Sequence, residues 1–507
     1  MLRERIKSSA IIILIINLIF LTGQLWFDSS TTIGADTMRY IRTLPIVERI
    51  FPLQPEYSIS KENLSRPRKF LINDGSLWMA YYNTDIGFSP IEERTSEIIK
   101  GFLSGDITAS KKIDNTTWEA GLESLSIYVE YPVSFDAKMF CLIMGVDEDR
   151  APTEISSLHD LIILPSSEES SICILVRDSA DNDFYAYILS DRYKLPASDL
   201  SVYTNNNDGY YEPAFSTGLH LGEESKVSLS PLVLFSDSQP YTEVLLPHNL
   251  ITESSKNRLL ENFSFNPLSV TPYEDSDGAS NYIANYATAK LYGDSFFEYS
   301  SVSDDRGILL DESGDAYNVL NASIDFAEKT WSCVSSEPLS ILVTSDLSDY
   351  DSENAYTFKF DYYCNGRPVE IVLDEIPGRQ KMTSAIEMTV KGGRLISYRQ
   401  YMRSYNNVSV HMLSDTFVTA LDDFVKVLDK EAKESVTIND IYIGYLDRGE
   451  VGEINAAWLA KTSDGKIYRY SAKEGNDELE KDKKYNDNVP HCYEYCNACF
   501  YSNDINA

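Results

Sequence analysis

The sequence has few basic residues, few histidines and few cysteines. Its 44 Lys and Arg residues face 78 Asp and Glu residues, which gives a formal net charge of −34. A surface this negative repels a phosphate backbone, so we expect no nucleic-acid partner. Seven scattered cysteines in 507 residues do not form the framework of a disulfide-stabilised fold. The rest of the composition, 43% hydrophobic and 24% charged, is that of an ordinary folded chain with room for about three domains.

Complete catalytic motifs are also absent. The five histidines are dispersed, and there is no G-x-S-x-G or Walker A motif. Residues 58–61 match the S-x-x-K motif of penicillin-binding enzymes, and residues 391–393 resemble their K-T-G motif. However, this triplet precedes the S-x-N-like residues 404–406, which reverses the order in those enzymes. We therefore expect no enzymatic activity and no cofactor, and a penicillin-binding-type serine enzyme is the least favoured alternative.

Three cysteines gather near the C-terminal end. Cys492, Cys496 and Cys499 have the C-x3-C-x2-C spacing that holds iron–sulfur clusters in radical-SAM proteins, and His491 is adjacent. They follow a charged, polar segment, and no barrel follows them. The apolar segment described in the next paragraph also places them outside the cytoplasm, where we expect oxidising conditions. Thiols that pair or bind adventitious metal are therefore favoured over an iron–sulfur site, and zinc is only weakly indicated.

What the sequence does have is one long apolar segment, residues 8–27. Its 20 uncharged residues, at 1.5 Å each, span a hydrocarbon core of about 30 Å. Basic residues precede it and acidic residues follow it, which places residues 1–7 in the cytoplasm and the bulk of the chain outside. The length of the segment and the lack of an A-x-A-like cleavage site favour a retained single-pass anchor over a cleaved signal peptide.

Two polar residues interrupt this anchor. Asn17 and Gln24 are seven residues apart and so lie on one helix face. Polar side chains within a membrane tend to hydrogen-bond to another helix, which predicts that this face contacts a partner's transmembrane helix. The alternative is that Gln24 only reaches the interface and that Asn17 is tolerated in lipid.

The segment after the anchor alternates short strands with helices. This pattern predicts an α+β fold class, with a single transmembrane helix followed by about three extracytoplasmic domains with mainly antiparallel sheets. We expect a connector at residues 28–60, domains at residues 61–270, 271–366 and 367–472, and a charged, Cys-containing tail at residues 473–507.

Turn and cap signals predict several local elements. They are a hairpin over residues 69–82 around Asn73-Asp74-Gly75, a helix opened by a capping box at residues 89–92, a single strand over residues 290–299, a helix opened by Gly314-Asp315, a hairpin over residues 385–402, and a helix capped by Ser414 or Asp415.

Short motifs along about 450 residues occur in the order found in the YycH family, and together they resemble it. They are the basic start and Ile/Leu-rich anchor, residues 66–70 (RPRKF), Trp118, residues 126–132 (SIYVEYP), residues 259–263 (LLENF), Asn266-Pro267, Tyr282, residues 362–369 (YYCNGRPV), residues 438–445 (INDIYIGY) and Ala456-Ala457-Trp458. The last segment also resembles the C-terminal unit that YycH shares with its sister protein YycI.

This resemblance implies a non-enzymatic accessory protein of the sensor histidine kinase WalK (YycG) in Gram-positive bacteria. Its implied partners are the kinase, contacted through the membrane and outside it, and a YycI-like protein. The implied role is control of a two-component system that governs cell-wall metabolism. The alternative is a surface binding or adhesion module, which would not depend on this particular anchor.

Overall fold

The computed structural model describes residues 59–470, with short gaps at residues 84, 86, 167–170, 205–210, 218–220, 222–224, 237–239, 276–277, 349–354, 373–381, 414 and 432–433. The predicted anchor with Asn17 and Gln24, the connector up to residue 58, and the cysteine-containing tail lie outside these residues. Within residues 59–470, apart from the gaps, no helix has the length and apolar character needed to cross a membrane.

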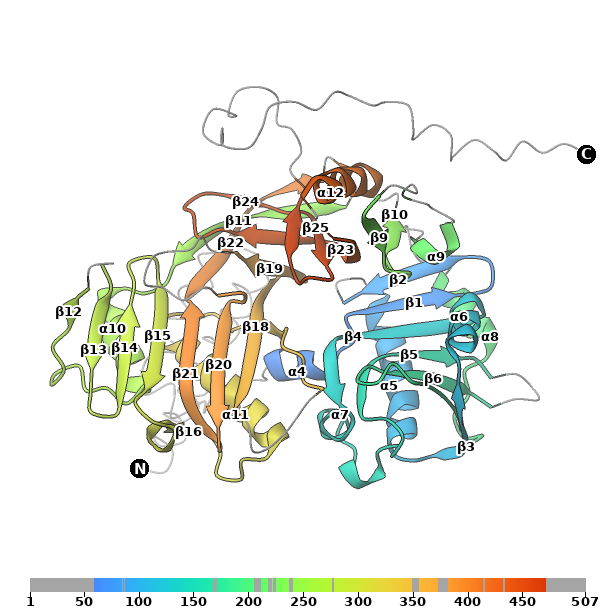
Figure 1. Ribbon diagram of the computed structural model, residues 1–507, viewed down its shortest axis with the longest axis horizontal. Helices are drawn as coiled ribbons and strands as arrows, with labels where there is room; N and C mark the ends of the chain where they lie inside the picture. Colours follow the sequence, from blue (N-terminus) through green and yellow to red (C-terminus); the bar gives the residue numbers. More distant parts are fainter. Residues whose placement is uncertain are drawn as a thin grey trace, which may run out of the picture.

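An antiparallel sheet of seven strands forms the N-terminal half of the described chain, in the order β2-β1-β4-β5-β6-β7-β3 (Figure 1). Its strands are β1 (Lys69–Asn73), β2 (Trp78–Tyr82), β3 (Ile107–Ile113), β4 (Ser126–Asp136), β5 (Ser157–Leu164), β6 (Cys173–Asp178) and β7 (Phe184–Leu189).

Both faces of this sheet are covered by helices. On one face, α5 (Phe88–Leu103) buries Ile91, Ile98 and Phe102 against Phe70 and neighbouring strand residues. On the other face, α6 (Asn115–Glu123) packs Trp118 and Leu122. The central strands are therefore buried on both sides, which explains why the first six residues of β4 are all buried instead of alternating with exposed ones.

A larger sheet of 14 strands dominates the C-terminal half of the described chain, with the path β12-β13-β14-β15-β21-β20-β18-β19-β23-β25-β26 and three more strands paired to it. Its strands are β9 (Val227–Leu229), β12 (Tyr273–Glu274), β13 (Ser280–Ile283), β14 (Ala287–Leu291), β15 (Phe296–Ser301), β16 (Ile308–Leu309), β17 (Ile341–Val343), β18 (Tyr356–Cys364), β19 (Arg367–Ile371), β20 (Ile386–Lys391), β21 (Arg394–Tyr401), β23 (Val436–Asp447), β25 (Ala457–Thr462) and β26 (Ile467–Arg469). Its pairs are antiparallel except β19–β23 and β23–β9, which are parallel.

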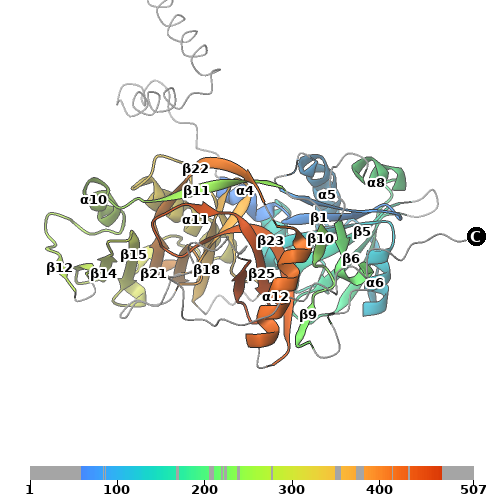
Figure 2. The same ribbon diagram turned by 90° about the horizontal axis from the view of Figure 1, so that it is seen from above.

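Two small sheets and several helices complete the described part of the chain. The small sheets are β22 (Arg403–Met412), β11 (Tyr241–Asn249) and β24 (Ile454–Asn455), and β10 (Leu234–Ser236) with β8 (Tyr211–Pro213). The remaining helices are α4 (Ile59–Ser65), α7 (Ala137–Ile143), α8 (Ala197–Thr204), α9 (Ala214–Thr217), α10 (Glu253–Asn262), α11 (Ala316–Ser332), α12 (Phe417–Glu431) and the 3-10 turns Glu148–Arg150 and Asp304–Arg306. Helix α12 packs beside β25 and β9 (Figure 2).

The α+β class with mainly antiparallel sheets is thus confirmed. The expected division into three domains remains a prediction, but strand pairing crosses its boundaries. Strands β9 and β11, which precede residue 270, pair with β23 and β22 near the C-terminal end. The expected boundary at residues 366–367 falls in the turn between β18 and β19.

Most of the local predictions are confirmed, including the hairpin around Gly75 and the helix capped by Asp315, whose carboxylate accepts the Asn318 N–H at 3.1 Å. The capping box at residues 89–92 is wrong. Helix α5 begins one residue earlier, at Phe88, because that ring is fully buried against Phe70, with ring centroids 4.8 Å apart. Gly87 precedes it without a side-chain cap.

Two other local predictions need correction. Residues 290–299 are not one strand but parts of the β14–β15 hairpin, with Gly293-Asp294 in its turn. This glycine-aspartate pair is a turn signal in its own right. Helix α12 is capped one residue after the predicted Asp415, where the Thr416 hydroxyl accepts the Thr419 N–H at 3.3 Å.

Candidate functional site: a cleft between the two halves

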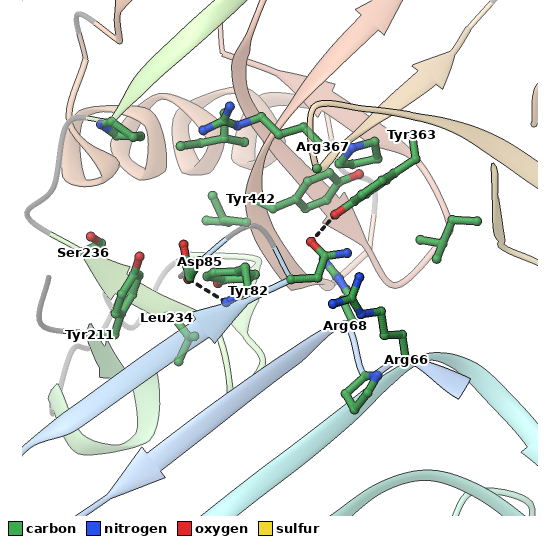
Figure 3. A pocket seen from close by; sticks show the side chains of 18 of the residues that line it. Arg66, Arg68, Tyr82, Asp85, Tyr211, Leu234, Ser236, Tyr363, Arg367 and Tyr442 are labelled. Atoms are coloured by element: carbon green, nitrogen blue, oxygen red, sulfur yellow. Dashed lines mark hydrogen bonds between the residues drawn. The ribbon is translucent and has the colours of Figure 1, made fainter. Parts of the chain in front are cut away.

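A cavity of about 190 Å³ lies where the N-terminal sheet meets the strands of the C-terminal half (Figure 3). Its walls come from the segment before β1, the end of β2, strands β8 and β10, the β18–β19 turn and β23. The cleft is therefore assembled from segments far apart in the sequence. No local spacing motif encodes it.

Arg68 lies in one wall and connects the two halves. Its guanidinium forms ion pairs with Glu130 of β4, at 3.4 Å, and with Asp440 of β23. It also lies 5.3 Å from the centroid of the Tyr442 ring. The backbone N–H of Arg68 donates to the Glu130 carbonyl at 2.7 Å, which extends the β1–β4 pairing by one residue and fixes the side chain at the cleft.

Two more arginines line the cavity, and each is also held by a carboxylate. Arg66 donates three hydrogen bonds of 3.1–3.2 Å to Glu92 of helix α5. Arg367 at the start of β19 pairs with Glu243 of β11 at 3.3 Å. These pairs fix the orientation of the guanidinium groups, so the cationic wall is set before any ligand enters.

Asp85 lies in the wall on the other side of the cavity (Figure 3). Its Oδ2 accepts the Tyr82 backbone N–H at 2.7 Å. Burial raises the pKa of this carboxyl, and the Tyr82 N–H and the Arg367 charge only partly offset that effect. No cation among the described residues lies within ion-pair distance of Asp85.

Aromatic rings separate the charged groups. Tyr82 and Tyr211 pack edge to face with ring centroids 6.2 Å apart. Tyr363 of β18 donates its hydroxyl proton to Asn83 Oδ1 across the cleft, and burial raises the pKa of Tyr363 to about 12. Tyr442 donates to Glu370 at 2.5 Å.

The contacts across this cleft continue into both halves. On the N-terminal side, Glu130 pairs with the buried Lys69 at 3.1 Å, and the Tyr128 hydroxyl lies between Glu130 and Asp160 at 3.2 and 3.0 Å. Burial raises the pKa of Glu130, but the charges of Lys69 and Arg68 outweigh it and lower the pKa to about 2. Arg68 thus lies at the end of a buried charge network in the N-terminal sheet. Through Asp440, Arg68 connects this network to the C-terminal half.

Helix α4 provides a second junction. The buried Ser60 hydroxyl donates to the Leu339 carbonyl at 3.2 Å, and Asn63 donates to the Ile341 carbonyl at 3.3 Å. Both acceptors lie at or just before β17 of the larger sheet. The start of the described chain is therefore held to the C-terminal half as well as to the first sheet.

The residues singled out from sequence do not form this cleft. Asn17, Gln24 and the three C-terminal cysteines lie outside the described residues. In the penicillin-binding-like motifs, Lys61 pairs with Asp325 at 2.5 Å and Lys391 pairs with Asp304 at 2.9 Å. Within residues 59–470, gaps excepted, no group of three His, Cys, Asp or Glu side chains is arranged to hold a metal ion.

The cleft residues themselves were missed as a site. Arg66 and Arg68 appeared only in the family-like motif at residues 66–70, and Arg367 only in the motif at residues 362–369. The available signal was two arginines within three residues of an otherwise acidic chain, directly before a buried strand. Asp85 carried no signal of its own.

Comparison with known proteins identifies the fold. No family model matches the chain, and no curated protein matches it. The crystal structure of YycH from Bacillus subtilis superposes with a TM-score of 0.52 at 14% identity, covering 80% of this chain and 96% of that one. An uncharacterized protein from Eubacterium rectale gives a TM-score of 0.27 at 9% identity, covering 51% of this chain and 86% of that one. The resemblance read from the order of the motifs is therefore confirmed at the level of structure, and this chain has the fold of YycH.

Proposed function

We propose that this protein is a non-enzymatic extracytoplasmic regulator, anchored by residues 8–27, that modulates a sensor histidine kinase of the WalK (YycG) type controlling cell-wall metabolism. The observation that carries the proposal is the YycH fold over 80% of the chain. The apolar segment ahead of that fold supplies a route to a membrane partner. A YycI-like protein is the expected second partner, because the C-terminal unit resembles one that YycH and YycI share.

A regulator of this kind requires that a change outside the membrane reaches the anchor. The described chain begins at α4, which is hydrogen-bonded to Leu339 and Ile341 of the C-terminal half. It then runs directly into Arg68, which pairs with both halves. A shift between the halves would therefore displace the segment that follows the anchor. Coupling of about 1–3 kcal/mol is typical of such regulation.

A non-catalytic role agrees with the chemistry of the cleft. Its three arginines are each engaged with a carboxylate, and desolvation raises the pKa of Tyr363 and Tyr442, so both hydroxyls stay protonated at neutral pH. The arrangement is suited to binding and to holding two halves together.

The anchor face provides the experiment. In detergent-solubilised membranes, the full chain should co-purify with the WalK-type kinase of the same cells. Replacing Asn17 and Gln24 with Leu should reduce the recovered kinase severalfold, because the polar contacts between helices are lost. The control exchanges Ile12 for Leu and Leu21 for Ile, which keeps the anchor apolar and leaves its polar face intact.

Equal recovery of the kinase with the Leu variant and the control would contradict docking through this face. Exchanging all of residues 8–27 for an unrelated anchor extends the test. A surface binding or adhesion module would keep its activity with the foreign anchor, whereas the proposed regulator would lose control of the kinase.

A further inference from the structure

The cleft has opposite charges on opposite walls. Asp85 lies on one side, beside Tyr82 and Tyr211, while Arg66 and Arg68 lie on the other (Figure 3). The arginines already have carboxylate partners, whereas Asp85 forms no ion pair with a described residue and only feels the Arg367 charge from beyond ion-pair distance. A partly buried carboxylate without a cationic partner is costly in a folded protein, so this wall favours an incoming ammonium group.

The opposite wall favours a carboxylate. Guanidinium groups have planar arrays of donors that match carboxylate geometry, and ion pairs fix their orientation before a ligand arrives. Arg66 uses its Nε and Nη2 for Glu92, and its Nη1 is not used in these bonds. Arg68 uses its two terminal nitrogens for Glu130 and Asp440, and its Nε is not used in these bonds.

The volume of the cavity and the side chains that line it restrict the class of ligand further. An apolar cavity of about 150 Å³ holds a benzene molecule, so about 190 Å³ admits a small molecule rather than a folded domain. Aromatic and aliphatic side chains, including Tyr82, Leu234 and Ile443, lie between the charged groups. An α-amino acid has its ammonium and carboxylate groups on one carbon. In an extended dipeptide the second residue increases the distance between these two groups by about 3.3–3.6 Å.

We propose that this cleft binds a short zwitterionic peptide of dipeptide size, with its amino terminus at Asp85 and its carboxylate at Arg66 and Arg68. An apolar side chain of the peptide then packs against the rings between them. Capture of chain termini by fixed charged groups is an established recognition mode, and a small number of polar groups within an apolar lining is typical of ligand sites. The inference concerns the cleft alone and does not depend on the identity of the kinase.

Isothermal titration calorimetry on the detergent-solubilised full chain tests it with L-alanyl-L-leucine. We expect saturable binding of one peptide per chain. N-acetylation removes the ammonium charge and C-terminal amidation removes the carboxylate, so each blocked peptide should bind about tenfold more weakly or worse. L-leucine alone should also bind at least tenfold more weakly, because its two charges lie closer together than those of the dipeptide.

Variants assign the charged ends. Asp85→Asn should weaken binding of the free dipeptide about tenfold while changing the affinity for the N-acetyl peptide less than about threefold. Asp85→Glu should retain binding, which shows that charge rather than folding is at issue. Asp183→Asn, in an exposed pair with Lys112 on a distant strand, is the matched control and should leave binding unchanged.

Any one of four results would overturn the proposal. The free dipeptide gives no saturable heat, the blocked peptides bind as tightly as the free one, or Asp85→Asn weakens the free and acetylated peptides equally. Thermal melting of each variant without peptide accompanies the titrations. An Asp85→Asn protein that melts like the parent and still binds the free dipeptide normally also contradicts the inference.

Discussion

Arg68 and Asp440 form an ion pair although they lie 372 positions apart in the sequence. Arg68 precedes the first strand of the N-terminal sheet, and Asp440 lies on β23 of the larger sheet. The same guanidinium contacts Glu130, so one side chain joins a buried charge network in one half to a strand of the other. This contact is one of several that fix the spatial relation of the two halves, together with the α4 and Tyr363–Asn83 hydrogen bonds.

We expect Arg68→Ala to lower the free energy of unfolding by about 2 kcal/mol, because Glu130 and Asp440 both lose a partly buried partner. In a double-mutant cycle with Asp440→Asn, the coupling energy should be about 1 kcal/mol or more. Urea denaturation of the four proteins measures both quantities. Lys426→Ala, in an exposed pair with Asp422, is the control and should change stability by less than about 0.5 kcal/mol. Additive effects of the two cleft substitutions would show that the pair contributes nothing.

Glu130 should make stability depend on acid pH. Its pKa is about 2 in the folded protein, against an ordinary value of 4.5, because the charges of Lys69 and Arg68 outweigh the effect of burial. Because the pKa is lower in the folded protein, the ionised carboxylate stabilises the fold at pH values above the pKa of the unfolded chain. This stabilisation is lost as the pH falls from about 4.5 toward 2. Between pH 6 and pH 2 the parent should therefore lose about 3 kcal/mol more than Glu130→Gln.

The measurement is the free energy of unfolding by urea at a series of pH values. Other acidic groups titrate in the same range, so Glu97→Gln, in an exposed helical pair with Arg94, provides the comparison and should follow the parent curve. Parallel curves for the parent and Glu130→Gln would contradict the assigned pKa.

Arg403 and Asp447 form the most deeply buried ion pair of the described residues. Both side chains are 1% exposed, and Arg403 Nη1 lies 2.6 Å from Asp447 Oδ1. Asp447 also accepts the Tyr405 hydroxyl and the Gly449 N–H, each at 2.8 Å. Arg403→Met should cost roughly 3–5 kcal/mol, because it leaves a buried carboxylate without its cation.

Thermal unfolding of Arg403→Met tests this expectation against Lys466→Met. Lys466 pairs with Asp464 at 2.6 Å on the surface, where solvent screens the pair, so its loss should cost far less stability. If the two methionine variants lost similar amounts of stability, burial would not make the Arg403–Asp447 pair more important than an exposed pair.

Two neighbouring glycines in the β20–β21 turn should respond differently to alanine. Gly392 and Gly393 both have positive φ, 54° and 69°. A Cβ on Gly392 meets nothing within 4 Å, whereas a Cβ on Gly393 overlaps the backbone carbonyl of Asp311. Gly392→Ala should cost about 1 kcal/mol for the left-handed backbone alone, and Gly393→Ala about 2 kcal/mol more because the Asp311 segment must move.

Circular-dichroism melting of the two variants is sufficient to check this difference. Equal losses would contradict the close approach of residue 311 to the turn. The expected difference would also show that residues 391–393, which resemble a K-T-G motif, have a structural role in this hairpin.

Local features of the fold could be predicted from sequence because their causes lie within a few residues. The Asn73-Asp74-Gly75 turn is one case, since Gly75 has a φ of 91° and donates its N–H to the Asn73 side chain at 2.8 Å. The start of α11 is another, since Asp315 caps it directly. Where a local rule failed, as at residues 89–92, the burial of Phe88 prevailed over the capping signal.

The cleft could not be predicted in this way because its parts meet only through long-range pairing. Ser228 and Thr437 hydrogen-bond across 209 positions in the parallel β9–β23 pair, and Tyr363 reaches Asn83 across 280. Nothing in the spacing of Asp85, Arg68 and Arg367 indicates that they share a cavity. The order of family-like motifs carried information that periodicity did not, because it reflects the whole fold.

We propose that this chain changes the activity of a sensor kinase through its own anchor. The most direct test is the autophosphorylation rate of the WalK-type kinase from the same cells, reconstituted in vesicles with the full chain or with a chain whose residues 8–27 are replaced by an unrelated transmembrane helix. We expect a severalfold change in rate with the full chain and little or none with the exchanged anchor. An unchanged rate with the full chain, or the same change with either anchor, would contradict it.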